Sequence, residues 1–204
     1  KQSMIDYPGN IAAVVFTCGC NFRCGYCHNP DLVIPEKIGK SDKYDVDDIL
    51  RYIKHHASFL DAVVITGGEP TLHGSLPCFL ERIREKGLKV KLDTNGTHPD
   101  MLKRLIDHAQ VDYVAMDVKA PLSISKYREI AGNGFNNTLM DGVIKSIQIL
   151  NQGLVDHEFR TTLDPRLTLE DIKSIMKVVT GKYYLQQMHK KDSPQEILPP
   201  SFSI

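Results

Sequence analysis

The sequence of 204 residues lacks an excess of charge of either sign, because 25 Lys and Arg residues balance 25 Asp and Glu residues. No global field therefore attracts the chain to nucleic acid or to an anionic membrane surface. It also lacks an apolar run of membrane-spanning length, a signal peptide, an internal repeat and a linker, although a chain starting at Lys1 does not show its natural start. These absences predict a single domain, residues 1–204, in the cytoplasm, with neither membrane nor nucleic acid as partner.

The five cysteines lack the even number and the wide spacing of a secreted disulfide framework. Four of them lie between Cys18 and Cys27, and Cys20, Cys24 and Cys27 have the spacing C-x3-C-x2-C. Thiolates bind soft metals, so this loop predicts a zinc or an iron–sulfur site. Structural zinc takes four ligands, and Cys18 or His28 could supply the fourth. A four-iron cluster with three protein ligands instead leaves one iron open to a small molecule.

Short apolar runs alternate with helical patterns along the rest of the chain. Strands are predicted at residues 11–16, 62–65, 88–92, 113–116, 158–163 and 183–187. Helices are predicted at residues 46–60, 76–83, 99–106, 143–150 and 168–179, with a short helix at best in 125–137. Such alternation predicts an α/β fold with parallel strands and right-handed crossovers. Six units are too few for a closed eight-stranded barrel, so we expect an open, partial (β/α)6 barrel of the TIM type, with its core at about residues 11–187 and an irregular tail at 190–204.

Two predicted helices carry start signals. Ser75 precedes the helix at 76–83 as a cap, and Thr168 to Asp171 resembles a capping box for the helix that follows. Cys78 falls near the apolar face of the first of these helices, so we expect it in the core.

Polar motifs follow the predicted strands. They are the cysteine loop, Gly67 to Pro70, Asp93 to Gly96, and the pair Asp117 and Lys119. Ligands of parallel α/β folds bind at the carboxyl ends of the strands. The motifs are therefore expected to converge on one site.

The cysteine motif has an aromatic residue, Tyr26, before its last cysteine, and in this form it resembles the signature of the radical S-adenosylmethionine (SAM) superfamily. Gly67-Gly68-Glu69-Pro70 is similar to the Gly-Gly-Glu-Pro motif of the same superfamily. The resemblance implies a [4Fe–4S] cluster on Cys20, Cys24 and Cys27, with SAM on the open iron. It also implies that one electron from the cluster cleaves SAM to a 5′-deoxyadenosyl radical.

Further segments are similar to the activating proteins of glycyl radical enzymes, and most of all to anaerobic ribonucleoside-triphosphate reductase activating proteins. The similar segments are residues 5–9, 64–71, 91–96, 116–121 and 158–162, within a likeness that runs from about 3 to 187. The resemblance implies hydrogen abstraction from a backbone glycine of a partner enzyme, anaerobic ribonucleotide reductase. It further implies an electron donor such as flavodoxin or ferredoxin, and no catalytic acid or base in this chain.

The same resemblance implies which residues bind SAM. They are Tyr26, Gly67, Gly68, Glu69, Pro70, Asp93, Thr94, Asp117, Lys119 and Arg160. In pyruvate formate-lyase activating enzymes, the positions that match Asp93, Thr94 and Asp117 hold a monovalent cation, so the resemblance extends to a cation site here. Simpler interpretations stay open: Asp93 as a turn residue, Asp117 with Lys119 as a salt bridge, and Arg160 in a surface ion pair.

Two other functions stay open as well. The first is a radical SAM enzyme that acts on a small molecule, and the second is a zinc or iron–sulfur binding module without catalysis. Only Cys18 and Cys78 remain outside the motif, and two thiolates cannot build an auxiliary cluster unaided. The lack of cysteines for a second cluster favours an activating protein over the other two functions. Cys18 is expected to be an unligated thiol.

Overall fold

The computed structural model describes residues 2–39 and 43–188, so the predicted tail at 190–204 lies outside the described residues. Seven strands form one open sheet in sequential order. They are β1 (Gln2–Ser3), β2 (Ala12–Thr17), β3 (Ala62–Gly67), β4 (Lys89–Thr94), β5 (Tyr113–Asp117), β6 (Asp156–Leu163) and β7 (Lys182–Gln187). Strands β2 to β7 are parallel, whereas β1 pairs antiparallel with β2. The α/β class and the open barrel of six parallel strands are confirmed.

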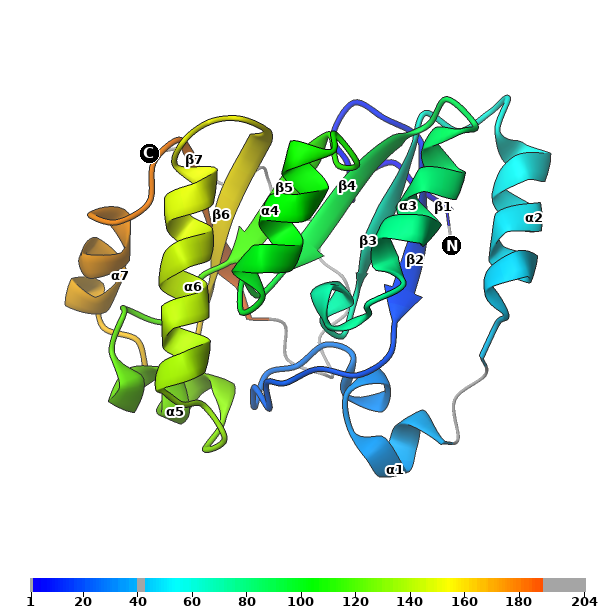
Figure 1. Ribbon diagram of the computed structural model, residues 1–204. Helices are drawn as coiled ribbons and strands as arrows, with labels where there is room; N and C mark the ends of the chain where they lie inside the picture. The colour runs from blue at the N-terminus through cyan, green and yellow to red at the C-terminus, as the bar shows by residue number, and fades with distance from the viewer. Residues whose placement is uncertain (1, 40–42, 189–204) are drawn as a thin grey trace.

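Helices connect these strands and cover one face of the sheet. They are α1 (Pro35–Ile38), α2 (Val46–His56), α3 (Leu76–Arg84), α4 (Pro99–Asp107), α5 (Ile124–Ala131), α6 (Asn137–Leu150) and α7 (Leu169–Met176), with 3-10 turns η1 (Pro30–Leu32) and η2 (Pro70–Leu72). Figure 1 shows α3, α4 and α6 in front of the sheet, with α2 and α7 at its two sides. The cysteine loop, α1 and α5 lie below the carboxyl ends of the strands.

The main core lies between the sheet and its helices. Strand residues such as Ile65, Leu92 and Met116 are fully buried there, together with helix residues such as Leu80 and Leu105. Neighbouring strand residues point to opposite faces, so the strands bury a second set of side chains on the other face. That second cluster is small and consists of Tyr7, Ala12, Val14, Ala62, Val64 and Tyr113.

The second face of the sheet changes character along the strands. Its apolar cluster lies toward the amino ends, where Val64, Lys91 and Tyr113 are register partners across β3, β4 and β5. Toward the carboxyl ends the inward positions are polar, and Asp117 pairs with Arg160 across β5 and β6. This face of the sheet is therefore apolar at the amino ends of the strands and polar at their carboxyl ends.

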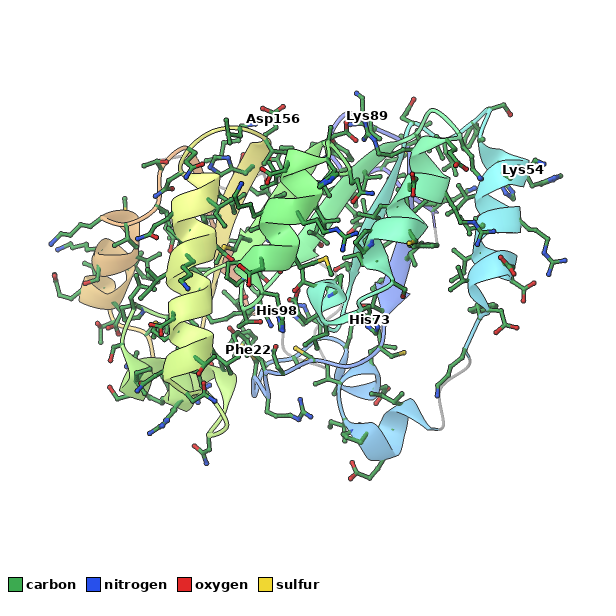
Figure 2. All side chains as sticks on the ribbon, in the orientation of Figure 1. Phe22, Lys54, His73, Lys89, His98 and Asp156 are labelled. Carbon is green, nitrogen blue, oxygen red and sulfur yellow. The ribbon has the colours of Figure 1, made fainter. Side chains whose placement is uncertain are left out.

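The loops that follow β2, β3 and β4 meet at the carboxyl edge of the sheet. Figure 2 labels Lys89 and Asp156 at the opposite edge, where β4 and β6 begin. It labels Phe22, His73 and His98, one from each of the three loops, at the lower edge where these strands end. The predicted convergence of the polar motifs is thus present in the fold.

Four local predictions have different outcomes. The capping box of α7 is confirmed, because Thr168 accepts a hydrogen bond from the Asp171 backbone and Asp171 accepts one from the Thr168 backbone. Ser75 is the N-cap residue of α3, but its side chain makes no capping hydrogen bond. The prediction that Cys78 is a core residue is wrong, because it is exposed. Helix α6 begins before residue 143, since Asn136 caps it at Leu139.

Candidate functional site

The cysteine loop begins where β2 ends, and its thiols are half-buried. The Cys20 thiol accepts a hydrogen bond from the Phe22 backbone N–H at 3.4 Å, and the Cys27 N–H donates to the Cys24 carbonyl at 3.1 Å. Burial raises the pKa of Cys20 to about 11 and also raises the pKa of Cys24. Burial thus favours the protonated form of these two thiols in the metal-free protein, and metal loading must displace their protons.

Anchors on neighbouring elements hold this loop. Phe22 is 3% exposed and packs edge-on against Tyr127 of α5 and Phe135, with ring centroids 6.4 and 5.6 Å away. The Arg23 backbone N–H donates to the Ala131 carbonyl at 2.6 Å. The loop is thus fixed from below by α5, and its backbone is not a free surface coil.

Gly67, the last residue of β3, and Gly68 after it contact the backbone that leads into the cysteine loop. The Gly68 N–H donates to the Thr17 carbonyl at 2.8 Å, and the next N–H, of Glu69, donates to the Gly19 carbonyl at 2.8 Å. A Cβ on Gly68 would lie 1.9 Å from the Gly19 oxygen, and Gly67 has a φ of +108°. Only glycine permits this approach of two backbones.

Glu69 joins the same segment to the end of β4. Its carboxylate accepts hydrogen bonds from the backbone and side chain of Thr71, from the Thr94 hydroxyl at 2.7 Å and from the Asn95 backbone at 2.6 Å. Burial raises the pKa of Glu69, although these hydrogen bonds oppose the rise. This carboxylate is held by protein donors, so it positions the two loops that flank the site.

Charged side chains meet at the ends of β4, β5 and β6. Arg160 Nε donates to Asp117 Oδ1 at 2.8 Å, and Lys119 Nζ donates to Asp117 Oδ2 at 2.8 Å. Burial raises the pKa of Asp117, but Arg160 and Lys119 outweigh it and lower the pKa to about 2. The predicted salt bridge of Asp117 with Lys119 is present, and Arg160 pairs inside the cleft rather than at the outer surface.

Asp93 is the least satisfied of these groups. Its Oδ1 is buried and accepts no hydrogen bond from the described residues. The cations near it are Arg160, with Nη1 at 3.5 Å, and Lys91, with Nζ at 3.8 Å. Burial raises the pKa of Asp93, while Arg160 and Lys91 oppose the rise. A ligand with a hydrogen-bond donor would satisfy this acceptor.

The polar groups surround one cleft of about 270 Å³ that is open to solvent. It is lined by Thr66, Gly67, Gly68, Glu69, Asp93, Thr94, Asn95, Asp117 and Arg160. Seven of the predicted SAM-binding residues are among these, whereas Pro70, Tyr26 and Lys119 are not. Lys119 lies behind Asp117, with its Nζ 5.8 Å from the centre of the Tyr26 ring.

Sequence reasoning missed two residues of the cleft. Thr66 follows Val64 by two positions on β3, so strand alternation places both on the same face. Asn95 belongs to the segment Asp93 to Gly96, which was expected to contribute Asp93 and Thr94 only. The sequence contained a signal for each residue: Thr66 has an inward position on its strand, and Asn95 is an amide within a polar motif.

The donor types of the cysteine loop suit a soft metal centre such as an iron–sulfur cluster. Among the described residues, no three His, Cys, Asp or Glu side chains lie close enough together to hold an ion, so the three thiols are not gathered into a preformed site. The adjoining cleft offers Asp93 Oδ1, which accepts no hydrogen bond from the described residues, and the close-packed backbone at Gly67 and Gly68. These features suit a polar ligand with an amino group, such as SAM.

Asp93, Thr94 and Asp117, the residues of the predicted cation site, all line the cleft. The Arg160 guanidinium contacts both carboxylates, and the Thr94 hydroxyl donates to Glu69. A monovalent cation at this place therefore stays a prediction.

The Cys18 carbonyl is 2.9 Å from Nε2 of the His73 ring. That the Cys18 thiol is unligated stays a prediction. Across the described ranges, no helix is both long and apolar enough to cross a membrane.

Known proteins resemble the chain over most of its length. The sequence profile of the radical SAM superfamily matches residues 14–179. A protein of Methanocaldococcus jannaschii, provisionally named a glycyl-radical enzyme activating enzyme, is 39% identical over 199 residues, which cover 95% of this chain and 80% of that protein. The pyruvate formate-lyase-activating enzyme of Clostridium pasteurianum is 27% identical over 186 residues, which cover 88% of this chain and 73% of that enzyme.

Solved structures of other proteins have a similar fold. Streptococcus suis SuiB bound to S-adenosylmethionine superposes with a TM-score of 0.67 over 89% of this chain, at 15% identity. The chain spans 41% of the SuiB structure, so the likeness concerns the fold alone. The superfamily profile, in contrast, covers most of the sequence. The chain therefore belongs to the radical SAM superfamily, and it is a radical SAM enzyme whose cofactors are a [4Fe–4S] cluster and S-adenosylmethionine.

Proposed function

We propose that the protein activates a glycyl radical enzyme by abstracting a hydrogen atom from a backbone glycine of that partner. The observation that carries the proposal is the near full-length match to two proteins that are both named as activating enzymes. The cleft at the carboxyl edge of an open sheet supports it, because a partner loop can approach such a site from outside. The partner we propose is anaerobic ribonucleotide reductase.

Two groups of residues have tasks in this proposal, and three residues of the second group have a further one. Cys20, Cys24 and Cys27 would hold the cluster through three thiolates and leave one iron open to SAM. SAM contacts are assigned to Tyr26, Gly67, Gly68, Glu69, Pro70, Asp93, Thr94, Asp117, Lys119 and Arg160, of which all but Tyr26, Pro70 and Lys119 line the cleft. Within this set, Asp93, Thr94 and Asp117 are also the candidates for a monovalent cation.

When bound, the cluster and SAM supply a 5′-deoxyadenosyl radical, which is the hydrogen-abstracting species. The chain itself binds and orients these two groups and shields the radical. Asp93 is an acceptor for an amino group, and Glu69 keeps the loops after β3 and β4 in register. Arg160 and Lys119 hold the Asp117 carboxylate in place and ionised. None of these residues is required to act as a general acid or base.

The proposal includes an environment and an electron donor. Reduction of the cluster requires a low-potential donor, for which we propose flavodoxin or ferredoxin. A cytoplasmic location suits free thiols reserved for metal. Equal numbers of acidic and basic residues support the absence of nucleic-acid and membrane partners.

Anaerobic reconstitution tests the activity directly. With dithionite and SAM, the protein should form 5′-deoxyadenosine, and with anaerobic ribonucleotide reductase it should produce a glycyl radical signal in electron paramagnetic resonance (EPR). SAM cleavage without a glycyl radical on any candidate partner would instead favour a small-molecule substrate. An intact cluster that releases no 5′-deoxyadenosine would refute the radical activity altogether.

The ligand assignment has its own test. Substitution of Cys20, Cys24 or Cys27 by Ala should reduce the iron content of the reconstituted protein from about four per chain to near background, because a cluster held by two thiolates is labile. Cys78→Ala is the matched control, since this exposed cysteine on α3 lies outside the loop. Full iron content in any of the three loop variants would contradict the assignment.

A further inference from the structure

A side-chain network joins the cysteine loop to the loop after β4, and the proposed function does not use it. Its members are Asn21 of the cysteine loop and Asn95 and Thr97 of the β4 loop. Asn95 and Thr97 are each 6% exposed. Figure 2 labels their neighbours in sequence, Phe22 and His98, at the same edge of the sheet. Buried amides in such a place need partners, and these have each other.

The three side chains form a closed ring of hydrogen bonds. Asn95 Nδ2 donates to Asn21 Oδ1 at 2.8 Å. Asn21 Nδ2 donates to the Thr97 hydroxyl at 2.8 Å, and that hydroxyl donates to Asn95 Oδ1 at 2.7 Å. Every member therefore gives one hydrogen bond and accepts one around the ring. Such a ring couples the orientations of the two amides, because turning one amide without the other would break it.

A backbone group fixes which way the Asn95 amide faces. The Thr97 backbone N–H, which can only donate, lies 3.1 Å from Asn95 Oδ1. The Asn95 oxygen must therefore face Thr97, and its NH2 group must face the cysteine loop. One hydrogen of that NH2 goes to Asn21, and the other is directed to Cys20, with Nδ2 3.9 Å from Sγ.

We propose that Asn95 is a positioning residue of the cluster, which donates an N–H to the Cys20 sulfur and thereby raises the reduction potential of the cluster. Reduction adds negative charge to the cluster and its thiolates, and a hydrogen-bond donor stabilises that charge. Cys20 already accepts the backbone N–H of Phe22, so Asn95 supplies the one side-chain donor to this sulfur among the described residues. The inference rests on the proposed role of Cys20 as a cluster ligand.

The test is a redox titration of the reconstituted cluster without SAM, followed by EPR. Asn95→Ala should lower the equilibrium constant for reduction at least tenfold, which is a shift of about 59 mV to more negative potential for a one-electron couple. The iron content should stay at the wild-type level, because the three cysteines are unchanged. A wild-type midpoint potential in this variant with full iron content would overturn the proposal.

Asn151 provides a matched control at the opposite end of the fold. Its amide makes three hydrogen bonds, to the Val178 carbonyl at 2.9 Å and from the backbone and hydroxyl of Thr180. Asn151→Ala and Asn95→Ala should both lower the thermal stability of the metal-free protein, because each removes several side-chain hydrogen bonds. Only Asn95→Ala should move the midpoint potential, and an equal shift in both variants would mean a general loosening of the fold.

Asn95→Asp covers the case in which the alanine variant does not fold. It keeps the shape of the side chain and the oxygen that accepts from Thr97, and replaces the donor toward Cys20 by an acceptor. The midpoint potential should move in the same direction, with the equilibrium constant for reduction falling by more than tenfold. An unchanged midpoint potential would overturn the proposal. A wild-type protein without an iron–sulfur EPR signal would instead contradict the proposed cluster on Cys20, which separates the two failures.

Discussion

At the scale of single residues, the site depends on how closely two backbones approach. Gly68 donates its N–H to Thr17 and lies against Gly19, so the segment after β3 and the cysteine loop are in direct contact. This contact holds a segment that lines the cleft against the cysteine loop. A Cβ at Gly68 would separate the two segments.

Gly68→Ala should therefore destabilise the protein by about 1–3 kcal/mol, the usual cost of overpacking, because its Cβ would lie 1.9 Å from a backbone oxygen. Urea unfolding of the metal-free protein measures this effect. Gly74→Ala is the control, since a Cβ there meets nothing within 4 Å. Equal stabilities of the two variants would show that the loops can move apart at no cost.

The sequence predicted which residues gather at this site, but not how they contact one another. Asp93, Thr94, Asp117 and Arg160 were expected at the cleft, and they line it. The contact of Glu69 with SAM stays a prediction, and the sequence did not show that its carboxylate accepts hydrogen bonds from Thr71, Thr94 and Asn95. Hydrogen-bond partners on other segments decide such contacts, and no local pattern in a sequence records them.

At the scale of elements, two helix starts show that a residue at the N-cap position does not always make a capping hydrogen bond. Thr168 and Asp171 exchange hydrogen bonds at the start of α7, whereas the Ser75 side chain makes none at the start of α3. Ser75 has helical backbone angles, with φ of −80° and ψ of −5°. A capping side chain needs the extended backbone that Thr168 has.

Thr168→Ala should cost about 1 kcal/mol in the free energy of unfolding, because it leaves a helix N–H without its acceptor. Ser75→Ala should change that free energy by much less, since no capping bond is lost. Denaturant midpoints of the two variants provide the comparison. A larger loss for Ser75→Ala would contradict the assigned caps.

The same scale explains which elements were predictable. Buried runs such as Ala62 to Ile65 give strands a clear signal, so all six parallel strands were found. β1 has two residues, Gln2 and Ser3, and no periodicity can be read from two positions. Cys78 was misplaced, because Leu76, Leu80 and Ile83 define the buried face of α3 and a residue two positions after Leu76 points away from it.

At the scale of the whole molecule, one face of the sheet carries a buried charge network from β4 to β6. Lys91 donates to the Asp6 carbonyl at 2.6 Å and lies 3.8 Å from both Asp93 and Glu158. Arg160 continues the network toward the cleft, where it binds Asp117. The network thus links the N-terminal segment, the sheet and the cleft, and its stability depends on pH.

The sign of that dependence follows from Asp117. Its pKa of about 2 lies below the ordinary value of 3.8, because Arg160 and Lys119 outweigh the opposing effect of burial. A carboxyl group whose pKa is lower in the folded than in the unfolded protein stabilises the fold above its unfolded pKa. This stabilisation should be present above about pH 4 and lost as the pH falls toward 2.

Asp117→Asn should lower the free energy of unfolding of the metal-free protein by about 1–3 kcal/mol near neutral pH, because it leaves Arg160 and Lys119 with an uncharged partner. The gap to wild type should narrow as the pH falls from 4 to 2, since wild-type Asp117 then becomes neutral too. Urea titrations across this pH range measure the gap. Asp107→Asn is the control: it breaks the exposed pair with Lys103, 2.7 Å apart, and should change stability by less than about 1 kcal/mol. A gap for Asp117→Asn that stays constant down to pH 2 would mean that the carboxylate is not held ionised by its two cations.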